Sequence, residues 1–412
     1  MFRKKTLKHM KGEITTYNCY SSKLDHRTRV KNFFNFGYID RIPFVDWAGH
    51  PCFIDFKWKN ERIIPSDADL FVMAGYDGSE GPCTEEIIDI ENNKGHFYWP
   101  TRGLEWVNFN LHPIPEFKLK KWRDDKGYEY QIEPFSGGIS KRLPPSEKNP
   151  YGGLTAFKAP VTTKDDWDEY KTHFNGKDIN RYPHKAGVCE IKRYRETKQS
   201  VNLRMEGIWT RAMNTFGTED FYYKIVDEPN FIEEVLDFYM DFSIDLATPA
   251  LEKFQIDTAS IVDGIGYEGG SWASKEMFKE LLLPRYKKMV CKIREYGIRT
   301  VYFDCGGGIK NLIPYLISAG FEGTNYIPMS AGMNVVELKK EYGKDFILMG
   351  GIDRRIISFG TKDEIKNEIE RVMSVVPVGG YLPYLDGGIY IETPIENYLY
   401  YAEILGKSLG AK

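Results

Sequence analysis

The chain has 412 residues, and 42% of them are hydrophobic, which is enough for a large buried core. Its 56 basic and 59 acidic residues give a net charge of −3 and exclude the basic excess that is typical of nucleic-acid binding. We recognise neither a signal peptide nor an apolar run of about 18 residues, and the six cysteines are scattered without a CxxC pair. We therefore expect a cytoplasmic protein that keeps reduced thiols and does not enter a membrane.

Amino-acid composition and hydrophobic pattern change along the first half of the chain. Residues 1–26 are interpreted as an N-terminal extension, and residues 27–412 as a single domain. Helical spacing over 29–34 is followed by a short apolar strand over 42–45. From 51 to 195 Pro, Gly and aromatic residues are frequent, and a hairpin pairs 116–122 with 128–132. We interpret 51–195 as an insertion over the mouth of the fold. Four of its tryptophans either form a substrate lid or pack the insertion onto the core: Trp58, Trp99, Trp106 and Trp122.

From residue 200 onward, strands and helices alternate. The predicted strands are 201–205, 257–262, 299–303, 322–327, 346–349 and 380–385. The predicted helices are 219–254 with an interruption near Pro229, 275–296, 309–318, 335–342, 362–376 and 394–405. This alternation implies a parallel sheet, and with the strand near 42 it nearly completes an α/β fold of the (β/α)8, TIM-barrel type. A doubly wound sheet is less favoured because no GxGxxG follows a first strand.

Active sites of such barrels gather where the strands end. Acidic residues with glycines close by in the sequence stand at these positions: Glu206, Asp263, Asp304, Asp353 and Asp386. Asp beside Gly is also ordinary turn or helix-cap chemistry, so each carboxylate has a structural alternative. Cys305 directly follows a strand and precedes three glycines, which favours a thiolate or a metal ligand over a small buried residue.

These segments together resemble the uroporphyrinogen decarboxylase superfamily, on the branch of corrinoid-dependent methyltransferases. The resemblance rests on the order and spacing of several motifs. They are 29–44 with Asp40-Arg41-Ile42-Pro43-Phe44, Asp304-Cys305-Gly306-Gly307-Gly308, Ala331-Gly332-Met333-Asn334-Val335, Gly350-Gly351-Ile352-Asp353 and Pro394-Ile395-Glu396-Asn397. The resemblance covers residues 200 to 405 well, 27 to 50 more loosely, and the region between them weakly.

The chain departs from the family pattern in two places. The segment Asp46-Trp47-Ala48-Gly49-His50 stands where the decarboxylases have arginines for the carboxylates of their substrate, so porphyrinogen decarboxylation is disfavoured. Phe303 stands where related methyltransferases have a zinc-binding histidine, although Cys305 keeps the first cysteine of that site. A zinc ion held by Cys305 and Asp386 is a possible cofactor that the resemblance implies.

The resemblance implies a methyltransferase that moves a methyl group between a small methylated substrate, such as a methoxyarene or methylamine, and a corrinoid on a separate carrier protein. We expect catalytic roles for Glu206, Asp263, Asp304 and Asp386, and substrate binding by Trp47, His50, Tyr267 and Asp353. A homodimer is possible, since family members are often dimers. Two alternatives stay open, namely a decarboxylase of a small carboxylated substrate and a non-catalytic relative that binds a ligand.

Overall fold

The computed structural model describes residues 24–47, 57–66, 68, 70–77, 104–107, 109–143, 153–181 and 199–411. Its centre is a parallel sheet, in which every neighbouring pair of strands runs in the same direction. The strands in spatial order are β1 (Leu104–Val107), β6 (Ser200–Glu206), β7 (Thr258–Val262), β10 (Val301–Asp304), β11 (Gly323–Asn325), β12 (Ile347–Met349) and β13 (Tyr381–Leu382).

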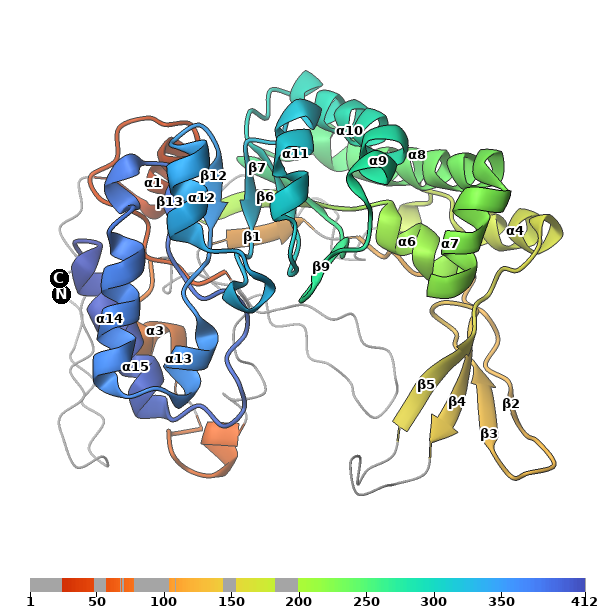
Figure 1. Cartoon of the computed structure of the whole chain (residues 1–412), viewed down its shortest axis with the longest axis horizontal. Helices are drawn as coiled ribbons and strands as arrows, with labels where there is room; N and C mark the ends of the chain where they lie inside the picture. The colour runs from red at the N-terminus through yellow and green to blue at the C-terminus, as the bar shows by residue number, and fades with distance from the viewer. Residues whose placement is uncertain are drawn as a thin grey trace.

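Helices follow the strands along the chain and cover the sheet (Figure 1). They are α6 (Trp209–Phe216), α7 (Thr218–Asp227), α8 (Pro229–Lys253), α9 (Lys275–Met277), α10 (Leu283–Glu295), α11 (Ile313–Ala319), α12 (Val335–Tyr342), α13 (Arg354–Phe359), α14 (Lys362–Met373) and α15 (Ile395–Ser408). Strands that alternate with helices around one parallel sheet form the (β/α)8, TIM-type fold expected from the sequence. None of the described helices has the length and apolar character that crossing a lipid bilayer requires.

The predicted strand over 42–45 does not form within the described part of the chain. Phe44 and Val45 are buried, but the segment is extended without pairing to a described strand. The backbone N–H of Phe44 donates to the Asp77 carboxylate, and the Phe44 carbonyl accepts from the Asp77 N–H. Pro43 has no N–H to offer a neighbouring strand. A side chain and a loop therefore satisfy this backbone in place of a sheet ladder.

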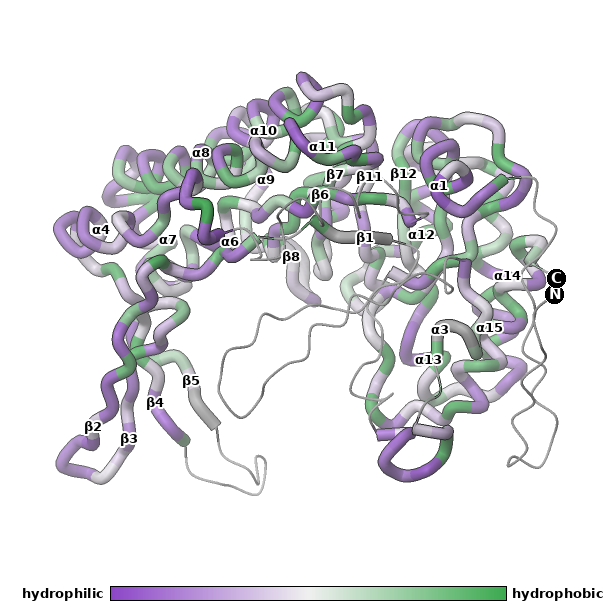
Figure 2. Tube along the Cα trace, turned by 180° about the vertical axis from the view of Figure 1, so that it is seen from behind, coloured by the Kyte–Doolittle hydropathy of each residue, from purple (hydrophilic) through white to green (hydrophobic). Residues whose placement is uncertain are grey.

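The region 51–195 contributes more to the fold than the sequence suggested. β1 lies inside it and pairs with β6, so part of the region belongs to the barrel sheet. The predicted hairpin is present as β2 (Lys121–Arg123) and β3 (Glu129–Ile132), but it extends to a four-stranded antiparallel sheet with β4 (Ile139–Leu143) and β5 (Gly153–Lys158). This sheet projects away from the barrel (Figures 1 and 2).

The N-terminal helix α1 (His26–Phe34) closes the barrel at the ends where strands begin. The Arg27 guanidinium donates to the Asp257 carboxylate at 2.8 Å, and the Thr300 hydroxyl donates to the Phe34 carbonyl at 3.0 Å. Asp257 and Thr300 directly precede β7 and β10. α1 does not cover the opposite ends of the strands, where the predicted site residues lie.

Candidate active site

Polar side chains line the inner face of the sheet because strand residues alternate between its two faces. On β6, Leu203 and Met205 lie in the hydrophobic core under the helices, so Arg204 and Glu206 face the other way, into the barrel. The strand register places residues in two cross-strand rows. The deeper row contains Arg204, Ser260 and Tyr302, and the row at the strand ends contains Glu206, Val262, Asp304 and Asn325.

Asp304 is the carboxylate of this inner face that is best suited to acid–base chemistry. It is 7% exposed, and among the described side chains only the Asn325 amide donates to it, at 3.3 Å. Burial raises the pKa of Asp304 to about 6, while the Arg204 charge and the Asn325 hydrogen bond act in the opposite direction. A buried carboxyl with one long hydrogen bond and a pKa near neutrality can hold and release a proton.

Glu206 lies in the same row as Asp304, two strands away. Burial raises the pKa of the Glu206 carboxyl, and the charges of Arg211 and Arg204 partly offset this effect. None of the described residues donates a side-chain hydrogen bond to it. The structure therefore brings Glu206 and Asp304 to one inner surface, as the sequence predicted.

Other residues of the inner face were missed by the sequence analysis. Asn325 donates to Asp304, and its amide oxygen accepts from the Tyr384 hydroxyl. Arg204 acts electrostatically on Asp304 and on Tyr326. The signal that could have found Arg204 is the alternation of Asn202, Arg204 and Glu206 in one strand, since polar residues at every second position mark a polar inner face.

Asp263 was predicted to be catalytic, but the structure places it on the outer face. Its oxygens accept from the Trp209 N–H at 2.8 Å, from the N–H and hydroxyl of Thr210 at 2.9 and 2.6 Å, and from the Tyr286 hydroxyl. These donors include the first backbone amides of α6, which have no partner inside the helix. This geometry favours the alternative role of Asp263, a helix cap.

Asp353 and Asp386 also bind backbone. Asp353 caps α13, where its Oδ1 accepts from the Arg355 N–H at 2.9 Å and its carboxylate pairs with the Arg355 guanidinium. Asp386 accepts from the Met329 N–H and the Arg354 N–H, both at 3.1 Å. Burial raises the pKa of Asp386 to about 6, against the effect of these two backbone hydrogen bonds. Asp386 therefore ties together the loops that follow β11, β12 and β13.

The residues predicted to hold a metal do not fit one. The Cys305 sulfur is buried and accepts from the Gly266 N–H at 3.2 Å, and burial raises the pKa of its thiol to about 12. Zinc binds the thiolate, which such burial disfavours. No group of three or more His, Cys, Asp or Glu side chains in the described part of the chain is arranged to hold a metal ion. Among the described residues, Cys305 and Asp386 therefore lack the partners that the predicted zinc site needs.

The predicted substrate-binding residues lie in different settings. Trp47 is 1% exposed and stacks on Phe34, and its carbonyl accepts from the Tyr326 hydroxyl at 3.2 Å. Tyr267 is 44% exposed on the hairpin of β8 (Gly266–Tyr267) and β9 (Gly270–Ser271), where its ring contacts Trp272. His50, Trp99 and the side chain of Trp106 lie outside the described residues.

The hairpin of β8 and β9 lies at the mouth of the barrel. The Gly308 N–H donates to the Tyr267 carbonyl at 2.9 Å, and both Gly308 and Cys305 follow β10. A Cβ on Gly307 would approach the Gly266 carbonyl carbon to 2.0 Å, so glycine is required for this contact. The glycines after Cys305 therefore allow the hairpin to pack against the end of β10.

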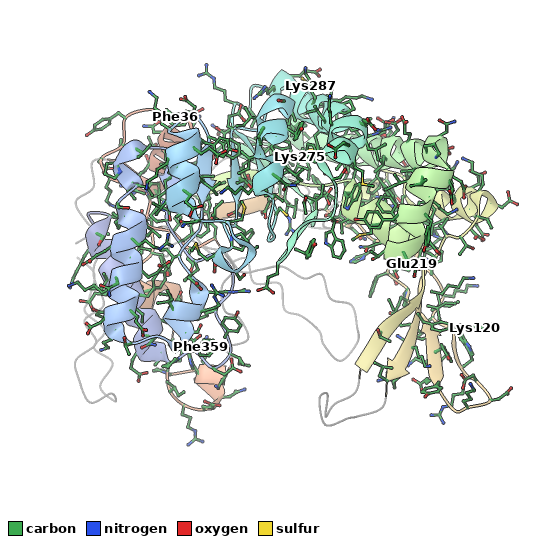
Figure 3. The ribbon with its side chains drawn as sticks, viewed as in Figure 1. Phe36, Lys120, Glu219, Lys275, Lys287 and Phe359 are labelled. Atoms are coloured by element: carbon green, nitrogen blue, oxygen red, sulfur yellow. The ribbon has the colours of Figure 1, made fainter. Side chains whose placement is uncertain are left out.

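Figure 3 labels Lys275, just beyond the hairpin, and Lys120, next to the projecting sheet.

Known proteins that are similar to this chain agree with the barrel architecture. The parallel barrel, with buried carboxyls where its strands end, places the chain in the class of α/β-barrel enzymes. The family model described as uroporphyrinogen decarboxylase (URO-D) matches residues 148–407, and the chain belongs to this family.

Individual relatives are distant. The chain is 24% identical over 211 residues to a uroporphyrinogen decarboxylase of a Synechocystis species, a match that covers 50% of this chain and 58% of that protein. It is 23% identical over 216 residues to the uroporphyrinogen decarboxylase of Crocosphaera subtropica, covering 51% and 59%. The matches thus span little more than half the length of these relatives. A solved structure, a methyltransferase from Methanosarcina mazei, aligns over 94% of this chain and 99% of its own with a TM-score of 0.55 and 15% identity, which shows the shared fold.

Proposed function

We propose that this chain is a methyltransferase that moves a methyl group between a small methylated substrate and a corrinoid cofactor on a partner protein. Three observations support the proposal. The chain belongs to the URO-D family, its fold matches that of a protein named as a methyltransferase over nearly its whole length, and its inner face carries a proton-holding carboxyl. The last of these carries the argument.

Asp304 supplies the acid that demethylation of an ether requires. When the bond between a methyl carbon and an ether oxygen breaks, the electron pair stays on the oxygen, and the resulting alkoxide or phenolate must be stabilised. A proton from the Asp304 carboxyl neutralises that oxygen as the methyl group leaves. The corrinoid, when presented by its carrier, supplies the nucleophile that takes the methyl group. In the reverse direction, Asp304 takes the proton from the acceptor.

Exposed aromatic rings at the mouth suit the approach of a large flat cofactor. Tyr267 and Trp272 are 44% and 37% exposed, and their ring centroids lie 4.7 Å apart on the hairpin that packs against the loop after β10. The Tyr222 hydroxyl donates to the Trp272 carbonyl and fixes the hairpin from α7. These rings would contact a macrocycle that covers the mouth. No step of this proposal passes through zinc.

The proposal is tested by methyl transfer in the absence of oxygen. Purified protein is mixed with cob(I)alamin and a pool of methoxyarenes, methylamines, methanol and methyl thioethers, and the cobalamin absorbance is followed. We expect methylation only when protein and donor are both present, and we expect it to be lost in the Asp304→Asn variant. Glu219→Gln, a change of an exposed residue on α7, is the matched control. No methylation with any donor, also with a native carrier protein, would contradict the proposal.

Decarboxylation of a small carboxylated substrate is the second candidate. It is favoured by the decarboxylase relatives and by Arg204, a cation on the inner face. In that case Asp304 would protonate the carbon that loses carbon dioxide. Release of carbon dioxide from a carboxylated substrate without corrinoid would favour this candidate over methyl transfer.

A further inference from the structure

Arg204 is a half-buried cation at the centre of the inner face. Its row across the sheet contains Ser260 on β7 and Tyr302 on β10. Its charge lowers the pKa of Asp304 and of Glu206 against the larger effect of burial, so the guanidinium acts on both acidic residues of the row above. It therefore lies inside the candidate active site rather than at its rim.

None of the described residues accepts a hydrogen bond from Arg204 or lies at ion-pair distance from it. Three buried arginines of the described residues have partners. Arg181 donates to four backbone carbonyls, and Arg285 pairs with Asp237 and donates to the Leu281 carbonyl. Arg29 pairs with Asp40. Arg204 is half-buried, and its N–H donors are not used by any described residue, so they are available to an acceptor such as a bound ligand.

We propose that Arg204 binds a carboxylate of the substrate, so that the methylated molecule handled by this site is a carboxylic acid anion. That the substrate is methylated rests on the proposed function, whereas the binding of a carboxylate by Arg204 does not depend on it. A guanidinium presents five N–H donors in a planar fork, which matches the two oxygens of a carboxylate. Glu206 and Asp304, although near, do not fill this fork.

The rows of the sheet place the anion and the methyl group at different depths. Arg204 precedes Glu206 by two residues in β6, so their backbone positions differ by about 6.6 Å along the strand. Asp304 shares the row of Glu206 but lies two strands away, which adds about 10 Å between the backbones across the sheet. A substrate with its carboxylate on Arg204 and its methylated oxygen at Asp304 therefore carries the two groups at opposite ends. A methoxybenzoate has this arrangement, with the methoxy group toward the mouth.

Binding measurements test the inference without any need for turnover. The probes are 4-methoxybenzoate and its neutral counterpart 4-methoxybenzyl alcohol, titrated into the full chain by calorimetry. We expect the wild type to bind the anion more tightly, and Arg204→Met to weaken binding of the anion about 10- to 100-fold while binding of the alcohol is unchanged. Arg299→Met, at an exposed position before β10, is the matched control and keeps the wild-type preference.

A second variant guards against a loss of fold. Arg204→Lys keeps the charge but not the planar fork, and we expect it to recover part of the preference for the anion. The inference is overturned if the wild type does not prefer the anion, or if Arg204→Met keeps that preference. An Arg204-dependent preference in a protein that transfers no methyl group would uphold the anion site and reject the methyltransferase.

Discussion

At the scale of single residues, the carboxylates that follow the strands differ in what their oxygens contact. Asp263, Asp353 and Asp386 each accept from backbone N–H groups at helix or loop starts. Asp304 and Glu206 do not, and they face the barrel interior. A carboxylate whose oxygens are occupied by the chain itself stabilises the fold, whereas one without such donors is available to a substrate.

The pH dependence of turnover should report Asp304. Burial raises its pKa to about 6, so the protonated acid is present below that pH and is lost as the pH rises through it. We expect the demethylation rate to fall above about pH 6 in the wild type. Asp304→Asn should lower kcat roughly 100-fold or more and remove this limb of the profile. An unchanged profile in the variant would assign the acid elsewhere.

The same residue makes a prediction about stability. An Asp whose pKa is raised by folding binds more protons in the folded than in the unfolded state, so it destabilises the protein as the pH rises from about 4 through about 6. Asn carries no charge at any of these values. The free energy of unfolding of Asp304→Asn, relative to that of the wild type, should therefore increase between pH 5 and pH 7. Denaturant unfolding at the two pH values measures this difference.

At the scale of elements, α6 is held by an aspartate from a neighbouring strand. Asp263→Ala removes the acceptor for the Trp209 and Thr210 amides, and we expect it to lower the free energy of unfolding by about 2–4 kcal/mol. A Cβ at Gly207 would lie 2.3 Å from the Asp263 carboxylate, so Gly207→Ala should destabilise through the same contact. Thermal unfolding of the single and double variants checks this. Additive losses would show that the contacts are independent.

The sequence predicted the sheet strands from β6 to β13 and most of the helices between them, because they have a clear apolar period between turn residues, but it did not predict α6, α13, β8 or β9. It could not predict that β1 joins the barrel sheet, since Leu104–Val107 is short and its partner β6 lies about 100 residues away in the chain. Glu206 and Asp304 could be found from strand ends alone. The structural role of Asp263 could not, because its donors lie on α6 and α10.

At the scale of the whole molecule, the mouth of the barrel is where a carrier protein would meet the chain. The hairpin of β8 and β9 presents Tyr267 and Trp272 there. Replacing both with Ala should raise the KM for the corrinoid about 2- to 10-fold per ring and leave the KM for the methyl donor unchanged. Tyr223→Ala removes a 61% exposed ring of α7 and serves as the control. Equal KM values for the corrinoid in all variants would place its contact elsewhere.

The contacts of the first helix have a consequence for synthesis of the chain. α1 leaves the ribosome well before β7 and β10, but its hydrogen bonds reach Asp257 and Thr300, which are 230 residues after Arg27 and 266 residues after Phe34. Until β10 emerges, Phe34 lacks Tyr302, one of the rings on which it stacks. Nascent chains with such distant partners expose apolar surface for longer and aggregate more readily. Growing chains of this protein should therefore depend on chaperones until β10 has been made.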